Sequence, residues 1–183
     1  MSDSDPKDSQ QRAIAAYNRM MDRVKTALEG SGQDTLPKLR EGIAKAVRSA
    51  EQLGELSRDE AEKIAAYLQR DLHDAGEYLA ETGRDLRSWL RFDVELIEDR
   101  LWDLFSSVAD RTRLEWLELA QRAEKGPSYS SGEITGPGTL RCSACQQDLH
   151  FHATAHIPPC PHCHGTNFIR PVDAMISGPP LPS

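Results

Sequence analysis

All four cysteines of the chain lie in one C-terminal stretch, as two Cys-x-x-Cys pairs separated by fourteen residues. The pairs are Cys142-Ser-Ala-Cys145 and Cys160-Pro-His-Cys163. Each pair places two thiolates on one side of a tight turn, so a small hairpin that joins the turns completes a closed tetrahedral shell for one Zn2+. The spacing therefore predicts a single structural zinc ion with the four cysteines as its ligands. A closed shell has no open position for a substrate, which argues against metal catalysis.

The residues around the two pairs predict a small β structure. Short strands are expected at Gly138–Arg141, Gln147–His152 and Thr166–Arg170, and Ala153–Ile157 is expected to return alongside the second of them. These segments contain too few apolar residues to hold about 40 residues together without the metal. Residues 138–171 are therefore predicted to form a zinc ribbon of three short strands.

Three other uses of the cysteines stay open at this point. Two disulfides need an oxidising compartment, and the N-terminus does not resemble a secretory signal. A thioredoxin-type redox pair needs a strand-to-helix context that the sequence lacks. A 4Fe–4S cluster also takes four cysteines, but paired Cys-x-x-Cys turns in a hairpin suit zinc better.

Five of the six histidines also lie in this stretch: His150, His152, His156, His162 and His164. We expect them to be polar surface residues, because four cysteines already fill the coordination sphere. One alternative is that a histidine replaces a cysteine as ligand. Another is that His162 and His164 form a weak accessory metal site.

Before the ribbon, residues 11–125 carry apolar side chains at alternating spacings of three and four residues, which predicts amphipathic helices. Ser57 and Glu60 form a capping box, which marks the start of the third helix. The first three helices are expected to carry the apolar series Ile14–Leu28, Leu36–Leu53 and Ala61–Leu79.

A fourth helix is expected to run unbroken from about Arg84 to about Glu124, a length of roughly 60 Å. The predicted fold is therefore mainly α: an elongated antiparallel hairpin or bundle with coiled-coil-like packing, followed by the small β zinc ribbon. Packing within one chain is the simpler expectation, and self-association through the helices is the alternative. Trp89, Trp102 and Trp116 are expected to pack between helices, and an exposed binding face is the alternative for them.

Composition limits the possible partners and the compartment. The formal charge is −7, and the ribbon adds only Arg141 and Arg170 as cations, so nucleic-acid binding through overall charge is disfavoured. No apolar run approaches the ~18 residues of a membrane span. Four reduced thiols and a polar N-terminus without a targeting pattern indicate a cytoplasmic protein that does not bind membranes.

The same reasoning predicts where the parts of the chain meet. Residues 1–10 and 172–183 are expected to be disordered, because they are polar or rich in glycine and proline. Residues 126–137 begin with Gly126-Pro-Ser-Tyr-Ser-Ser-Gly132 and are expected to form a flexible linker between helices and ribbon.

The order of parts resembles the YbeL-like family of bacterial zinc-ribbon proteins, a family of unknown function. The resemblance runs from the first helix to Arg170, and its specific features are the lead Gly132-Glu-Ile-Thr-Gly136 and the two cysteine turns. It implies a cytoplasmic bacterial protein whose four cysteines bind the metal, and it carries over no catalytic residues. The chain departs from many ribbons by placing His164 before Gly165, where a left-handed turn is expected.

The sequence contains no nucleophile–base pair, no phosphate-binding loop and no open metal site, so we do not expect an enzyme. The leading hypothesis is an interaction or adaptor protein whose ribbon presents a rigid surface to a protein partner. One alternative is binding of nucleic acid or the transcription machinery through the ribbon. Another is a redox or metal sensor in which oxidation of the cysteines releases zinc, although no further cysteine is present to resolve a sulfenic acid.

Overall fold

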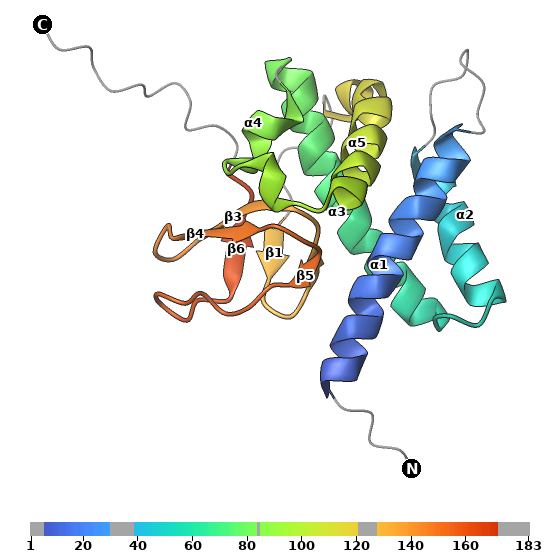
Figure 1. Ribbon diagram of the computed structural model, residues 1–183, viewed down its shortest axis with the longest axis horizontal. Helices are drawn as coiled ribbons and strands as arrows, with labels where there is room; N and C mark the ends of the chain where they lie inside the picture. The colour runs from blue at the N-terminus through green and yellow to red at the C-terminus, as the bar shows by residue number, and fades with distance from the viewer. Residues whose placement is uncertain (1–5, 30–38, 84, 121–127, 172–183) are drawn as a thin grey trace, which may run out of the picture.

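The computed structural model describes residues 6–29, 39–83, 85–120 and 128–171. A helical body precedes a small β part, which confirms the predicted fold class (Figure 1). The helices are α1 (Pro6–Glu29), α2 (Leu39–Gln52), α3 (Arg58–Thr82), α4 (Leu86–Leu90), the short 3-10 helix η1 (Val94–Leu96) and α5 (Asp99–Ala120). The strands are β1 (Ser128–Ser130), β2 (Ile134–Thr135), β3 (Gly138–Cys142), β4 (Asp148–Phe151), β5 (Ala155–His156) and β6 (Asn167–Ile169).

The four longer helices pack around one apolar core. α3 lies against α2 and α5, and α1 lies against the same two helices. Tyr17, Leu68 and Phe105 are fully buried between them. The predicted capping box is present at the start of α3, where Ser57 and Glu60 each accept a hydrogen bond from the backbone of the other. Within the described residues, none of the helices is both long and apolar enough to cross a membrane.

The prediction of one unbroken helix from Arg84 to Glu124 is wrong, because α4, η1 and α5 take its place. α4 begins after Asp85, whose carboxylate accepts the Arg87 N–H at 2.9 Å, and it ends at Arg91 in the left-handed conformation (φ 64°). Asp93 then caps η1 in the same way as Asp85 caps α4. Aspartate favours such caps because its short side chain binds nearby backbone N–H groups.

The break lets two aromatic side chains meet. Trp89 of α4 stacks on Phe105 of α5, with ring centroids 5.6 Å apart and an interplanar angle of 19°. In one continuous helix these residues would be separated by about 24 Å along the axis. Trp89 therefore packs between helices, as expected, while Trp102 is half-buried on α5. The side chain of Trp116 lies outside the described residues.

The ribbon has two antiparallel sheets instead of the three strands predicted. The larger sheet has the order β1-β6-β3-β4, and β2 pairs with β5. The predicted strands at Gly138–Arg141, Gln147–His152 and Thr166–Arg170 correspond to β3, β4 and β6. The predicted pairing of Ala153–Ile157 with the second of these strands is wrong, because β5 pairs with β2. Ile134 of β2 is buried in the core of the helices, and this contact holds β2 where β5 can reach it.

Two predicted boundaries also change. Residues 6–10, expected to be disordered, form the start of α1, where Pro6 suits the first helical position and Asp8 pairs with Arg12. The expected linker at 126–137 contains β1 and β2, which pair with β6 and β5. The expected tail at 172–183 lies outside the described residues.

The ribbon is attached to the helical body through a buried polar cluster, which we call the interface cluster. Figure 1 shows the sheets against one side of the helices, where β2 contacts α1 and α3 and β3 contacts α4. The interface cluster consists of Tyr17, Arg70, Asp71, Asp74, Trp89, Tyr129, Glu133, Thr135 and Arg170.

Asp71 of α3 receives hydrogen bonds from both parts of the molecule. Its carboxylate is fully buried and accepts the hydroxyl of Tyr17 at 2.7 Å. It also accepts the backbone N–H of Gly136 at 2.7 Å and Nη2 of Arg170 at 3.4 Å. A buried carboxylate requires partners of this kind, because burial removes its hydration.

Arg170 follows β6 and enters the helical body, where its side chain is only 4% exposed. Nη2 donates to Oγ1 of Thr135 at 3.1 Å, and Nε donates to the hydroxyl of Tyr129 at 3.2 Å. The guanidinium lies 4.5 Å from the ring centroid of Trp89, in a cation–π arrangement. Gly138 is required beside it, because a Cβ at that position would overlap Nη1 of Arg170.

Asp74 is the second carboxylate of α3 in the interface cluster. Tyr129 donates its hydroxyl to Oδ2, and Nε of Arg170 lies 3.5 Å from the same oxygen. Burial raises the pKa of Asp74 to about 7, although Arg170 and the hydroxyl of Tyr129 both favour the charged form. Without these two partners the pKa of Asp74 would be higher still, so they favour the ionised form near neutral pH.

Arg70 is the remaining member of the interface cluster. It binds the Gly-Glu-x-Thr segment that precedes the ribbon. Its guanidinium pairs with the carboxylate of Glu133, donates to the carbonyl oxygen of Ile134 at 2.9 Å and lies 3.8 Å from the ring centroid of Tyr129. Glu133 therefore binds Arg70 of α3, while Oγ1 of Thr135 donates to Asp71 of the same helix at 3.4 Å. The Gly-Glu-x-Thr lead attaches the ribbon to the helices.

We expect Asp71→Ala to lower the free energy of unfolding by about 3–5 kcal/mol, because Arg170 and Tyr17 each lose a hydrogen-bond partner in a buried site. Glu62→Ala is the matched control on the same helix, since Glu62 forms an exposed pair with Arg58 at 2.8 Å. That change should leave stability nearly unaltered. Urea denaturation of both variants provides the comparison, and equal losses would contradict the importance given to the buried carboxylate.

Candidate metal centre

The structure brings the four predicted ligands together at one end of the ribbon. All four Sγ atoms lie within 4.8 Å of one another. Those of Cys142 and Cys163 are 3.6 Å apart, as are those of Cys145 and Cys160. A tetrahedral Zn2+ with Zn–S bonds of about 2.3 Å needs sulfur separations of about 3.8 Å. The arrangement therefore fits a tetrathiolate zinc site, and none of the four cysteines is in a disulfide.

The two Cys-x-x-Cys turns have the same main-chain geometry. In each turn the first cysteine donates its N–H to the carbonyl five residues later and accepts the N–H of the residue four positions later. The turns are thus matched halves that each present two sulfurs. The bonds are Cys142 to Gln147 (2.9 Å), Gln146 to Cys142 (3.0 Å), Cys160 to Gly165 (2.9 Å) and His164 to Cys160 (2.8 Å).

The residue after each turn is left-handed, with φ 64° at Gln146 and φ 60° at His164. The left-handed position predicted at Gly165 therefore lies one residue earlier, at His164. Gly165 is needed for another reason, because a Cβ there would lie 3.2 Å from the sulfurs of both Cys142 and Cys163. Its N–H also donates to the sulfur of Cys163 at 3.4 Å.

The thiols of Cys142 and Cys145 have pKa values that are shifted in opposite directions. The backbone N–H of Cys145 donates to the sulfur of Cys142 and is the main reason that its pKa is lowered to about 7. For Cys145, the backbone N–H of Gln147 lowers the pKa, but desolvation and the neighbouring thiols outweigh it and raise the pKa to about 12. The group can therefore lose a first proton easily but resists further charge. A divalent metal supplies the positive charge that four thiolates require.

The histidines of the ribbon take other positions. Four of the five are exposed, as expected, and His156 is half-buried. Among the described residues, the group of ligand atoms that fits a metal contains the four cysteines and no histidine. His150 and His152 instead lie edge-on against Phe92, with ring centroids 5.7 and 4.6 Å away. They contribute to the contact between the ribbon and the helices.

Sequence reasoning missed the interface cluster, although part of its signal was present. Asp71 and Asp74 follow Leu68 in steps of three residues, which places both carboxylates near the apolar face of α3. Charges on a buried face need partners. The partner Arg170 is 99 residues away from Asp71 in the sequence, so no local spacing could identify it.

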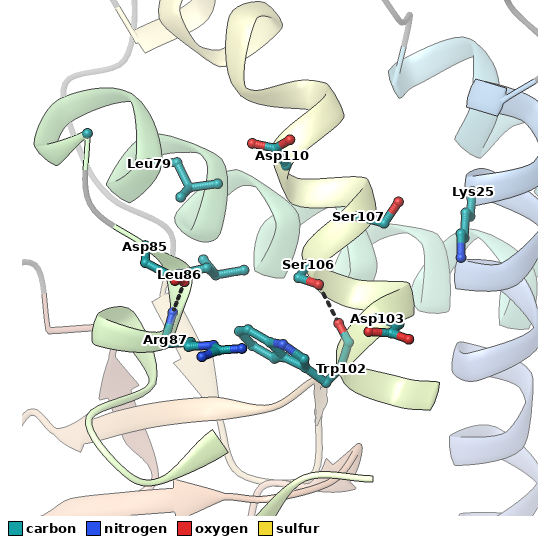
Figure 2. Close-up of a pocket in the computed structure, with 11 residues that line it drawn as sticks. Lys25, Leu79, Asp85, Leu86, Arg87, Trp102, Asp103, Ser106, Ser107 and Asp110 are labelled. Atoms are coloured by element: carbon teal, nitrogen blue, oxygen red, sulfur yellow. Dashed lines mark hydrogen bonds between the residues drawn. The ribbon is translucent and has the colours of Figure 1, made fainter. Parts of the chain in front are cut away.

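A groove of about 740 Å³ lies between α1, α3, α4 and α5, and none of its lining residues belongs to the ribbon (Figure 2). Lys25, Arg87, Trp102 and Ser106 are among these residues. Figure 2 shows that the hydroxyl of Ser106 is bonded within the helix, where it donates to the carbonyl oxygen of Trp102 at 2.7 Å. The lining has no histidine or cysteine, so this groove contains no serine–histidine or cysteine–histidine pair.

The chain matches known proteins over both the helices and the ribbon. A family model described as a zinc-ribbon containing domain matches residues 26–171. The uncharacterized proteins YbeL of Escherichia coli strain K12 and of Escherichia coli O157:H7 are each 31% identical over 121 residues, which is 64% of this chain and 72% of theirs. No solved structure matches the chain. The chain therefore belongs to the YbeL-like family of bacterial zinc-ribbon proteins.

Proposed function

We propose that this protein is a non-enzymatic interaction protein, or adaptor, in which one structural Zn2+ holds a small binding surface against a helical body. The observation that carries the proposal is the closed set of four sulfurs at one end of a ribbon that the interface cluster fixes to α3. Four thiolates fill a tetrahedral zinc site and leave no position for a substrate. The role of the metal is therefore to fold the ribbon.

The surface that we propose for binding surrounds the second cysteine turn. Cys160 is fully buried, but Pro159, Pro161, His162 and His164 are exposed around it. The turn holds these side chains in fixed positions, because its backbone is hydrogen-bonded and its cysteines would be anchored to the metal. A rigid surface of this kind loses little conformational entropy when a partner binds.

A protein partner is favoured over nucleic acid by the state of the two ribbon arginines. Arg141 forms a two-pronged pair with Asp148, at 2.6 and 2.9 Å, and Arg170 is buried in the interface cluster. Both cations of the ribbon are therefore already neutralised by carboxylates, whereas binding to phosphates relies on available lysine and arginine side chains. Free thiols also suit a reducing compartment, which supports a cytoplasmic location as part of this proposal.

Metal analysis of the purified full-length protein is expected to find one zinc ion per chain. Cys160→Ser should lose this zinc, because it removes one of four ligands from a closed shell. His162→Ala is the matched control, since His162 lies two residues away in the same turn and is exposed. Retention of zinc by Cys160→Ser, or its loss from His162→Ala, would contradict the assignment of the ligands.

The binding role is tested by capture of partners from a cytoplasmic lysate, with and without nuclease treatment. We expect a nuclease-resistant protein that binds the native chain and is lost with Cys160→Ser/Cys163→Ser. A His162→Glu variant keeps all four ligands, so its failure to capture the partner would assign the contact to the surface of the turn. Capture that disappears after nuclease treatment would favour nucleic acid instead, and capture that survives in the double variant would exclude the ribbon as the contact.

A further inference from the structure

The metal centre and Arg170 lie on the same pair of short strands. β3 ends at Cys142, and β6 follows the second cysteine turn. In the pairing of these strands Cys142 lies opposite Phe168, two residues before Arg170. Arg170 is the residue immediately after β6, and its side chain lies in the interface cluster. The sulfur cluster and the buried guanidinium are therefore positioned by one continuous piece of sheet.

The ribbon depends on the metal to hold this sheet together. Its own apolar core consists of eight buried residues, and two of them are the metal-centre cysteines Cys142 and Cys160. The strands contain two to five residues each. A core of this size cannot order the strands by itself, so the metal must contribute to their folding. The strand that delivers Arg170 is therefore stabilised when the metal draws the four sulfurs together.

The helical body, in turn, depends on Arg170. Asp71 and Asp74 are both buried on α3, and Arg170 pairs with each of them. Arg70 is the other cation beside Asp71, but its guanidinium is also engaged by Glu133 of the ribbon. Departure of the ribbon would remove Arg170 from both carboxylates, and a buried carboxylate without its cation is strongly unfavourable. Without the ribbon, these carboxyl groups would face water or bind a proton in place of Arg170.

We propose that zinc binding and the docking of the ribbon on α3 are one coupled equilibrium, so that loss of the metal releases Arg170 and exposes a guanidinium-binding cleft on the helical body. The cleft consists of the two carboxylates Asp71 and Asp74, the hydroxyl of Tyr17 and the ring of Trp89. Its present occupant is a guanidinium held by charge, hydrogen bonds and a cation–π contact.

Coupling of this kind is reciprocal, because docking that favours zinc binding must itself be favoured by zinc. Weakening the interface cluster should therefore lower the affinity of a metal centre whose ligands are unchanged. This inference rests on the proposed zinc binding. It adds that the free energy of zinc binding stabilises the docked helices through Arg170.

The first test compares zinc affinity in the full-length chain by competition with a chromophoric chelator. Arg170→Met is expected to lower the affinity by more than about tenfold. Arg141→Met is the matched control, because it removes the other arginine of the ribbon, whose hydrogen-bonded partner Asp148 lies within the ribbon. Equal affinities for Arg170→Met and Arg141→Met would overturn the proposal.

A second measurement decides the question if Arg170→Met fails to fold. Hydrogen exchange of the native protein is followed before and after removal of zinc by a chelator. The N–H of Gly136, which donates to Asp71, should lose its protection together with the N–H groups of Gln146 and His164 in the cysteine turns. Protection that persists at Gly136 while the cysteine turns exchange freely would show that docking is independent of the metal.

These outcomes separate the inference from the proposed function. A chain that binds no zinc at all would contradict the structural zinc of the proposed function. A chain that binds zinc normally, but with the same affinity in Arg170→Met and Arg141→Met, would contradict the coupling alone.

Discussion

A guanidinium buried against two carboxylates joins the two parts of this protein. Arg170, Asp71 and Asp74 all lose their hydration when the ribbon docks, and this costs several kcal/mol per ion. The hydroxyls of Tyr17 and Tyr129 offset part of this cost by donating hydrogen bonds to the two carboxylates, whereas Nη1 of Arg170 is buried without a hydrogen-bond partner among the described residues. We interpret the cluster as a source of specificity more than of net stability, since few other placements of the ribbon would satisfy these charges.

Several features of the chain follow from this interaction. α3 contributes three side chains to the cluster, and α1 and α4 contribute one each. The interruption between α4 and α5 allows Trp89 to lie between Phe105 and Arg170. Gly138 leaves room for the arginine, and the lead from Gly132 to Gly136 supplies bonds to Arg70 and Asp71. The cysteine turns lie at the far end of the same strands, so the surface proposed for binding stays exposed.

Local features were readable from the sequence, and features that depend on distant contacts were not. The cysteine turns and the capping box of Ser57 and Glu60 depend on residues a few positions apart, so spacing was enough to predict them. The break in the predicted long helix was missed because the apolar spacing continues across it, although Asp85 and Asp93 supply local caps there. The contact of Trp89 with Phe105, which accompanies the break, joins residues too far apart in the sequence for local spacing to predict. The pairing of β2 with β5 and the partners of Arg170 were missed for the same reason.

The central claim is that Arg170 and Asp71 depend on each other as buried partners in the folded protein. A double-mutant cycle in the zinc-loaded full-length chain tests it most directly, with unfolding free energies measured for Arg170→Met, Asp71→Asn and both changes together. We predict that the double variant loses less stability than the sum of the single losses, by more than about 1 kcal/mol. Losses that add to within about 0.5 kcal/mol, as expected for Arg141→Met combined with Asp71→Asn, would contradict the account.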